Sequence, residues 1–161
     1  MKKWLAAILL VILVGLDQFT KYLAATFLQG KNPVVLIKNV LEFCYLEGGN
    51  TGAAFGLFQG KTLALGILSL ILFILLIVVF IKISEKPDTF LLSLSIIVMA
   101  SGALGNCIDR IFRHAVIDFI YFKWIDFPIF NLADCYVTVS AVALFLLVAF
   151  SKDNEKDAAE E

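Results

Sequence analysis

The sequence contains few of the residues on which metal centres and disulfide-stapled folds depend. Among 161 residues there are one histidine, three prolines and three cysteines, and only 17% of the chain is charged. A lone histidine without a cysteine cluster argues against a zinc site. Three cysteines without a CxxC spacing predict neither a metal knot nor a disulfide framework, and are interpreted as small buried hydrophobes. A net charge of -1 gives no reason to expect a nucleic-acid partner.

Apolar residues are abundant instead. They make up 61% of the chain, and mean hydropathy is +0.94, whereas soluble domains are about 45–50% apolar. Four apolar stretches, about 4–28, 62–83, 90–108 and 132–150, approach the length of roughly 20 residues that a membrane-spanning helix needs. We therefore expect an α-helical integral membrane protein with four transmembrane helices in a single membrane domain, 1–150. A cleaved signal peptide at the start is a poorer interpretation, because no small-x-small site precedes Asp17.

The distribution of basic residues predicts the orientation. Short segments at the amino terminus, between the second and third spans, and after the fourth span carry Lys2, Lys3, Lys82, Lys86, Lys152 and Lys156. The positive-inside rule gives most weight to short loops, so both termini are expected in the cytoplasm. The loops 29–61 and 109–131 then face outward. Residues 151–161 form a charged cytoplasmic tail that is expected to be disordered.

The first outer loop is too apolar to be a plain linker. Val34–Ile37 and Leu41–Leu46 are β-prone runs, and several glycines follow them. We expect a small extracytoplasmic β-sheet between the first and second helices, lying on the membrane surface.

The polar residues of the spans gather near the outer face. With a rise of about 1.5 Å per residue, Asp17 and Lys21 lie roughly 20–25 Å along the first helix. Asp109 lies near the outer end of the third helix, and Asp134 near the outer start of the fourth. Ionisable residues in such positions are costly, so they are usually paired, exposed to water or functional.

Two groups favour structural roles. Asp17 and Lys21 have the i,i+4 spacing of an ion pair, which is favoured over a ligand contact. Asn106, Asp109 and Arg110 share one helix face, and the small residues before them allow close helix packing. This second group is interpreted as a polar clamp that holds the shape of a site or binds a lipid head group.

Asp118 and Asp134 have no obvious basic partner nearby in sequence. Alone, Asp118 could be a water-exposed loop acid, and Asp134 could simply favour the start of a helix capped by Asn131. Brought together, two carboxylates cannot both ionise readily, and such a pair can activate water against an amide, as in aspartic proteases. A proton-coupled transporter and a non-catalytic lipid-binding subunit remain as alternatives, although transport sites usually lie near the bilayer midplane.

Five short motifs, in this order on four spans, resemble the lipoprotein signal peptidase family, also called signal peptidase II. The motifs are Asp17–Lys21, Asn50–Phe55, Gly102–Arg110, Val116–Phe119 and Phe130–Asp134. Two positions depart from the family pattern: Ser101 replaces a common glycine, and His114 stands where glycine is frequent. Serine should still permit close packing, and histidine tolerates a positive φ better than most residues.

The resemblance implies a multi-pass bacterial enzyme of the cytoplasmic membrane, working near the outer leaflet. It implies an aspartic endopeptidase that removes signal peptides from diacylglyceryl-modified prolipoproteins, on the amino side of the lipidated cysteine, without a metal or other cofactor. Its partners would be those precursors and membrane lipids. By motif position the catalytic pair is Asp118 and Asp134. The residues that would bind substrate or support the site are Asn50, Asn106, Asp109, Arg110, Asn131, Asp17 and Lys21.

Overall fold

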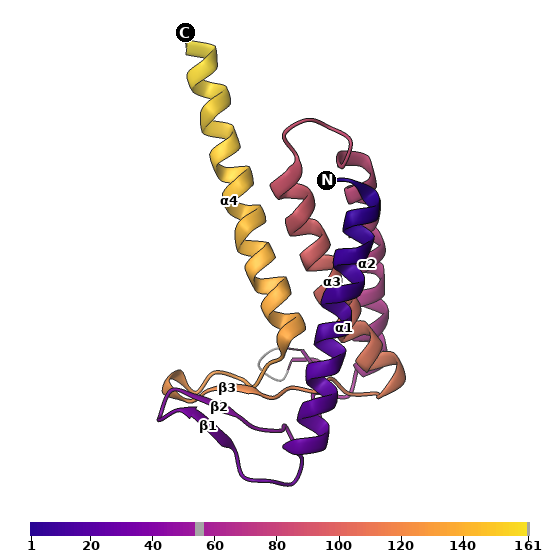
Figure 1. Cartoon of the computed structure of the whole chain (residues 1–161), viewed down its shortest axis with the longest axis vertical. Coiled ribbons are helices and arrows are strands. Elements are labelled where there is room, and N and C mark those ends of the chain that lie inside the picture. Colours follow the sequence, from indigo (N-terminus) through magenta and orange to yellow (C-terminus); the bar gives the residue numbers. More distant parts are fainter. Residues whose placement is uncertain (54–56, 161) are drawn as a thin grey trace.

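The computed structural model describes residues 1–53 and 57–160, with side chains described as far as residue 150. Ala54 and Phe55 of the second motif therefore lie outside the described residues. The described chain forms the helices α1 (Lys3–Phe27), α2 (Thr62–Ile83), α3 (Phe90–Phe112) and α4 (Leu132–Glu160). It also forms the strands β1 (Val34–Ile37), β2 (Leu41–Phe43) and β3 (Ile120–Phe122), followed by the short 3₁₀ helix η2 (Lys123–Ile125). The sheet lies at one end of the helices and both termini at the other (Figure 1).

All four helices are long and apolar enough to cross a membrane, which confirms the four-span prediction. Helix α3 is the central one, because it packs against α1, α2 and α4. In its most apolar window 61% of the residues are buried inside the protein, against 11% in each of the other three helices. The polar residues of α3 are therefore surrounded by protein, whereas the outer faces of its neighbours are left for lipid.

Glycines allow the close packing of α3 that the sequence indicates. A Cβ atom on Gly102 would lie 2.5 Å from the carbonyl oxygen of Ala133 in α4, and one on Gly105 would lie 2.5 Å from Oδ2 of Asp17 in α1. Ser101 is fully buried, and its hydroxyl donates a hydrogen bond to the carbonyl of Ile97 one turn earlier. The serine is thus accommodated without an unsatisfied polar group.

The sheet is antiparallel with the order β1-β2-β3. Strands β1 and β2 are the two predicted runs, although β2 ends at Phe43 rather than Leu46. The third strand was not predicted, because Ile120–Phe122 belongs to the second outer loop and pairs with β2 across a long sequence separation. The sheet therefore joins the two outer loops. Beyond β2, the Leu46 N–H donates to the Asp118 carbonyl, which ties that loop to the same structure.

Two helix ends differ from the sequence prediction. Helix α3 ends at Phe112 rather than near residue 108, so Asp109 and Arg110 lie in its last turns, in agreement with the helix face predicted for them. Helix α4 continues to Glu160 rather than ending at Phe150 in a disordered tail. Low hydrophobicity led to the prediction of disorder, but Ala, Glu and Lys are good helix formers, and extending an existing helix needs no new nucleation.

Candidate active site

Asp118 lies in an extended segment that is fixed on both sides. The backbone of Val116 exchanges two hydrogen bonds with that of Asn50, and Ile120 exchanges two with Phe130. The Asp118 side chain is only 2% exposed. Its Oδ2 accepts a hydrogen bond from Asn50 Nδ2 at 2.9 Å, and its Oδ1 accepts one from Asn131 Nδ2 at 2.6 Å. Both oxygens of this carboxyl group are therefore oriented by side-chain amides.

The turn that leads into this segment contains His114, whose φ is 60°. Residues other than glycine rarely adopt this left-handed conformation, and histidine is among those that tolerate it. The backbone at residue 114 therefore has a conformation that glycine, the frequent residue here in the family pattern, adopts readily.

Asp134 lies in the first turn of α4, where it forms a capping box with Asn131. The Asn131 Oδ1 atom accepts a hydrogen bond from the Asp134 N–H at 3.0 Å, and Asp134 Oδ2 accepts one from the Asn131 N–H at 3.1 Å. This confirms the predicted helix start. The remaining oxygen, Asp134 Oδ1, accepts a hydrogen bond from Asn106 Nδ2 at 2.8 Å. Asp134 thus begins a helix and also faces α3.

Two asparagines connect the two aspartates. Asn106 Oδ1 accepts a hydrogen bond from Asn131 Nδ2 at 3.1 Å, and the same nitrogen bonds to Asp118. Because Asn106 also donates to Asp134, the hydrogen bonds run without a break from Asp118 through Asn131 and Asn106 to Asp134. The structure brings together in one cluster four of the residues that the sequence singled out.

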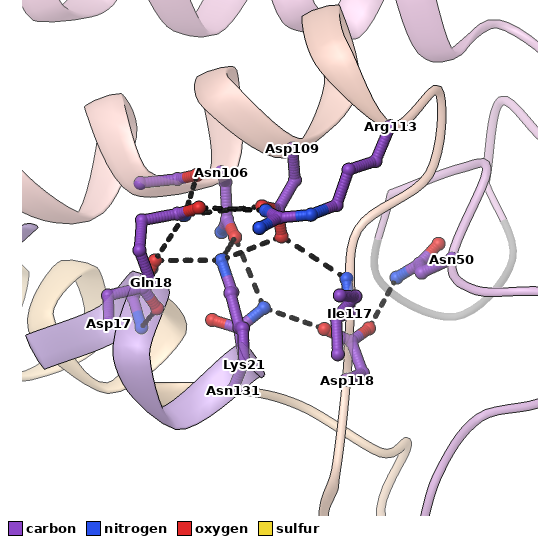
Figure 2. Close-up of polar contacts among 12 residues, drawn as sticks. Asp17, Gln18, Lys21, Asn50, Asn106, Asp109, Arg113, Ile117, Asp118 and Asn131 are labelled. Atoms are coloured by element: carbon purple, nitrogen blue, oxygen red, sulfur yellow. Dashed lines mark hydrogen bonds and ion pairs between the residues drawn. The ribbon is translucent and has the colours of Figure 1, made fainter. Parts of the chain in front are cut away.

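A buried cation lies behind this cluster. Lys21 Nζ contacts Asp17 Oδ2 at 2.9 Å, Asp109 Oδ2 at 3.0 Å and Asn106 Oδ1 at 3.0 Å (Figure 2). The side chains of Lys21, Asp17 and Asp109 are fully buried. The predicted ion pair of Asp17 and Lys21 is confirmed, and it extends to α3. Because an ammonium group has three donors, these three contacts satisfy it completely.

The second carboxylate oxygen of Asp17 helps to hold α4 in place. Asp17 Oδ1 accepts a hydrogen bond from the backbone N–H of Ala133 at 3.0 Å. That N–H belongs to the first turn of α4, where donors have no partner within the helix. The ion network therefore also fixes the start of the helix that carries Asp134.

Gln18 and Arg113 belong to the same network, although sequence reasoning did not single them out. Gln18 Nε2 donates to Asp109 Oδ1 at 3.2 Å, and Arg113 Nη1 bonds to Gln18 Oε1 at 2.7 Å and forms a close ion pair with Asp109. Figure 2 shows both side chains beside Asp109. Arg113 follows Asp109 at i,i+4, the spacing that led to the ion-pair prediction for Lys21, so the sequence did contain a signal for it.

Arg110 was predicted as part of a clamp. It is 9% exposed, and its Nη2 atom donates to the carbonyl of Gly52 at 3.1 Å. Its Nε atom is buried and has no hydrogen-bond partner among the described residues. Arg110 therefore holds the loop that follows Asn50, and its buried Nε–H is left without a partner among the described residues.

A cavity of about 820 Å³ gives access to this cluster. Asp118, Asp134 and Arg110 line it together with Asn50 and Asn106. The same cavity extends between three helices, where mostly apolar and small residues line it: Ser69, Leu72, Gly102, Ala103, Val137 and Thr138. Its outer part is lined by Tyr121 and the segment 126–130. One cavity thus combines a pair of carboxylates with a wall suited to an apolar chain.

The environment of Asp118 changes its acidity. Burial, together with the nearby charge of Asp134, raises the pKa of Asp118 from its ordinary value of 3.8 to about 6, although the hydrogen bonds from Asn50 and Asn131 and the charge of Lys21 oppose this rise. The site therefore has a carboxyl group that keeps its proton to a higher pH than an ordinary aspartate, beside a second carboxyl group. Such a pair can provide one acid and one base.

The described residues contain no group of three or more His, Cys, Asp or Glu side chains that could hold a metal ion. All three cysteines are free thiols.

Comparison with known proteins identifies the family of this chain. Residues 9–150 match the family model described as signal peptidase (SPase) II. The chain is 40% identical to a lipoprotein signal peptidase of Caldanaerobacter subterraneus subsp. tengcongensis, over 91% of this chain and 97% of that protein. It is 41% identical to a lipoprotein signal peptidase of Clostridium novyi, over 86% of this chain and 95% of that protein.

Solved structures give the same result. A bacterial membrane enzyme determined by the in meso method at 2.3 Å superimposes with a TM-score of 0.83 and 30% sequence identity, covering 94% of this chain and 92% of the other. A second bacterial membrane enzyme, determined by the in meso method at 1.9 Å, superimposes with a TM-score of 0.76 and 31% sequence identity, covering 91% of this chain and 93% of the other. From the family match and these relatives together, the chain belongs to the signal peptidase II family.

Proposed function

We propose that this protein is a lipoprotein signal peptidase, an aspartic endopeptidase that removes the signal peptide from diacylglyceryl-modified prolipoproteins. One observation carries the proposal: the Asp118–Asp134 pair lines a cavity that continues between apolar helices. A soluble peptide needs no such wall, whereas an apolar signal peptide with a lipidated cysteine does. Family membership supplies the class of substrate.

In the proposed mechanism, Asp118 and Asp134 act on a water molecule and on the scissile amide. One carboxylate accepts a proton from water as the oxygen attacks the carbonyl carbon, and the other, protonated carboxyl group donates its proton to the leaving amine. The raised pKa of Asp118 favours Asp118 as the protonated member of the free enzyme. Because the two acids are coupled, the proton belongs to the pair rather than to either residue alone.

The other polar residues have supporting roles in this proposal. Asn50 and Asn131 orient Asp118, and Asn106 orients Asp134. Lys21 acts through Asn106, since it holds the amide oxygen and thereby turns the amide nitrogen toward Asp134. Asp17 and Asp109 neutralise the buried ammonium group. Arg110 lines the cavity, so its guanidinium group is placed to bind a carbonyl oxygen of the substrate.

We further propose that both termini face the cytoplasm and that the site works near the outer leaflet. The positions of the lysines support this orientation, and the sheet supports a membrane-surface position, because the four apolar residues of β1 are each about half exposed. Substrate would then enter sideways from the bilayer, with its acyl chains remaining in lipid.

Fusions to alkaline phosphatase test this orientation. Alkaline phosphatase that is fused after Lys31 should be active, and alkaline phosphatase that is fused after Ser84 should be inactive. The reverse pattern would refute this orientation.

The catalytic roles can be tested with purified protein in detergent micelles and a synthetic diacylglyceryl peptide. Asp118→Asn and Asp134→Asn should each reduce peptide cleavage by at least about 10³-fold, as loss of an essential acid or base does. Asp88→Asn is the matched control, because Asp88 is an exposed acid in the turn between α2 and α3, and that turn lies at the end of the helices opposite the sheet (Figure 1). Full activity in either dyad variant would exclude the mechanism.

The same assay separates this proposal from the other two classes of function that the sequence left open. A proton-coupled transporter or a lipid-binding subunit would bind the peptide without releasing a fragment, whereas a peptidase releases the signal peptide. Mass spectrometry of the product would also locate the cut, which is expected on the amino side of the lipidated cysteine.

A further inference from the structure

The outer part of the cavity contains an acid that the proposed mechanism does not use. Asp126 and Tyr121 both line the cavity, and the Tyr121 hydroxyl donates a hydrogen bond to Asp126 Oδ1 at 2.6 Å. This contact also raises the pKa of Tyr121, so the phenol keeps its proton and remains a donor. The carboxylate of Asp126 is thus held in one position by a neutral partner.

The backbone around Asp126 is fixed as well. Asp126 lies at φ 48° and ψ 44°, directly after η2, and its N–H bonds to the carbonyl of Lys123 at 3.2 Å. The next residue, Phe127, bonds through its N–H to the carbonyl of Phe122 and packs edge-on against Phe130, with ring centroids 5.8 Å apart. A tight, aromatic-packed turn therefore presents this acid to the cavity.

No cation within the described part of the chain forms an ion pair with Asp126. The nearest lysine in sequence, Lys123, is engaged by Glu42, with Nζ and Oε1 2.8 Å apart. Asp126 is therefore a cavity-lining carboxylate without a counterion in the part of the chain that the structure describes, and a cationic group of a bound substrate would be attracted to it.

The position of Asp126 indicates which part of a substrate it meets. The apolar part of the cavity runs between helices, where a signal peptide would lie, whereas Tyr121 and Asp126 lie at the sheet end. If the scissile amide is placed at the two aspartates, the residues after the cysteine leave along the sheet end, at about 3.3 Å per extended residue.

We propose that Asp126, positioned by Tyr121, is a specificity-determining residue that favours precursors with a lysine or arginine shortly after the lipidated cysteine. This inference rests on the proposed peptidase function. It adds a preference for charge in the mature segment, which is separate from recognition of the lipid and of the apolar signal peptide.

The test uses diacylglyceryl peptides with lysine, glutamine or glutamate at each of the first four positions after the cysteine. An exposed charge pair changes an equilibrium by roughly 1.4- to 5-fold, so attraction of lysine and repulsion of glutamate should multiply to a Lys/Glu ratio of kcat/KM of roughly 2- to 25-fold at the best position. This ratio should fall in 0.5 M salt. In Asp126→Asn the Lys/Glu ratio should approach one.

Two controls make the result specific. Asp88→Asn removes one exposed acid that does not line the cavity and should keep the wild-type Lys/Glu ratio. Tyr121→Phe keeps the charge of Asp126 but frees its side chain, so the preference should spread over more than one position. A wild-type ratio near one at every position, or a ratio that survives Asp126→Asn, would overturn the proposal.

Binding separates failure of this inference from failure of the proposed function. The same peptides, each with a fluorescent label, are titrated with Asp118→Asn protein. Fluorescence anisotropy then measures their binding, and hence the preference for charge, without any cleavage. If Asp118→Asn protein binds the lysine peptide more tightly than the glutamate peptide, and if adding Asp126→Asn removes this difference, the role of Asp126 is supported even if no peptide is cut. Equal binding of both peptides refutes that role even if both are cut.

Discussion

Replacing Asp118 with asparagine should change how the stability of this protein depends on pH. A carboxyl group whose pKa is higher in the folded state than in the unfolded chain binds more protons when folded, so it makes folding less favourable as pH rises. The pKa of Asp118 is raised from 3.8 to about 6. The free energy of unfolding of the native protein should therefore fall between about pH 4 and pH 6. Above about pH 6 this contribution should change no further.

The size of this effect follows from the pKa values. At 1.36 kcal/mol per pKa unit, a rise from 3.8 to about 6 corresponds to about 3 kcal/mol at neutral pH. In the Asp118→Asn variant, the new amide would offer one oxygen to two donors, Asn50 and Asn131, so one amide contact is lost at every pH, at a cost of about 1–3 kcal/mol. That cost is independent of pH. The stability of the variant relative to the wild type should therefore rise by about 3 kcal/mol from pH 4 to pH 8.

The free energy of unfolding can be measured by SDS titration in mixed micelles, followed by the fluorescence of Trp4 and Trp124. Wild-type protein, Asp118→Asn and the exposed-acid control Asp88→Asn are compared at several pH values. The control should follow the wild type throughout. Parallel curves for wild type and Asp118→Asn between pH 4 and pH 8 would show that Asp118 does not carry the raised pKa, and would refute this reasoning.

Three further substitutions test other parts of the structure by the same unfolding assay. Gly105→Ala would place a Cβ atom 2.5 Å from the Asp17 carboxylate and should cost about 1–3 kcal/mol, whereas Gly15→Ala, with nothing within 4 Å, should be tolerated. Lys21→Met leaves the buried Asp17 carboxylate without a cation and should cost about 3–5 kcal/mol; a loss below about 1 kcal/mol would contradict the buried network. His114→Gly relieves a left-handed backbone conformation at φ 60° and should stabilise the fold by up to about 1 kcal/mol, without loss of peptide cleavage.

The spans and part of the ion network could be predicted because their signals are local. Long apolar runs identify the helices, and the i,i+4 spacing of Asp17 and Lys21 identifies their ion pair. The contacts of Lys21 with Asn106 and Asp109 could not be read in this way. They join α1 to α3 across more than 80 residues, and they depend on how closely the two helices pack at Gly105.

The site was predicted less completely than the fold. Asp118 and Asp134 were identified from their chemistry and from the family resemblance, and the capping role of Asn131 followed from its place before a helix. The third strand was missed because its partner lies in the other outer loop. No pattern in the sequence indicated a role for Asp126, because only the fold brings its turn to the outer part of the cavity.

The hydrogen bonds around the two aspartates have a fixed direction, and this limits how the sequence can evolve. An ammonium group only donates, so Lys21 requires the oxygen of Asn106, whose nitrogen must then face Asp134. Asn131 must in turn use its nitrogen toward Asn106 and its oxygen at the start of α4. Neither asparagine amide can be flipped without setting two donors or two acceptors against each other, and a substitution that turns a donor into an acceptor has the same effect. Viable substitutions at these positions should therefore arise in compensating pairs.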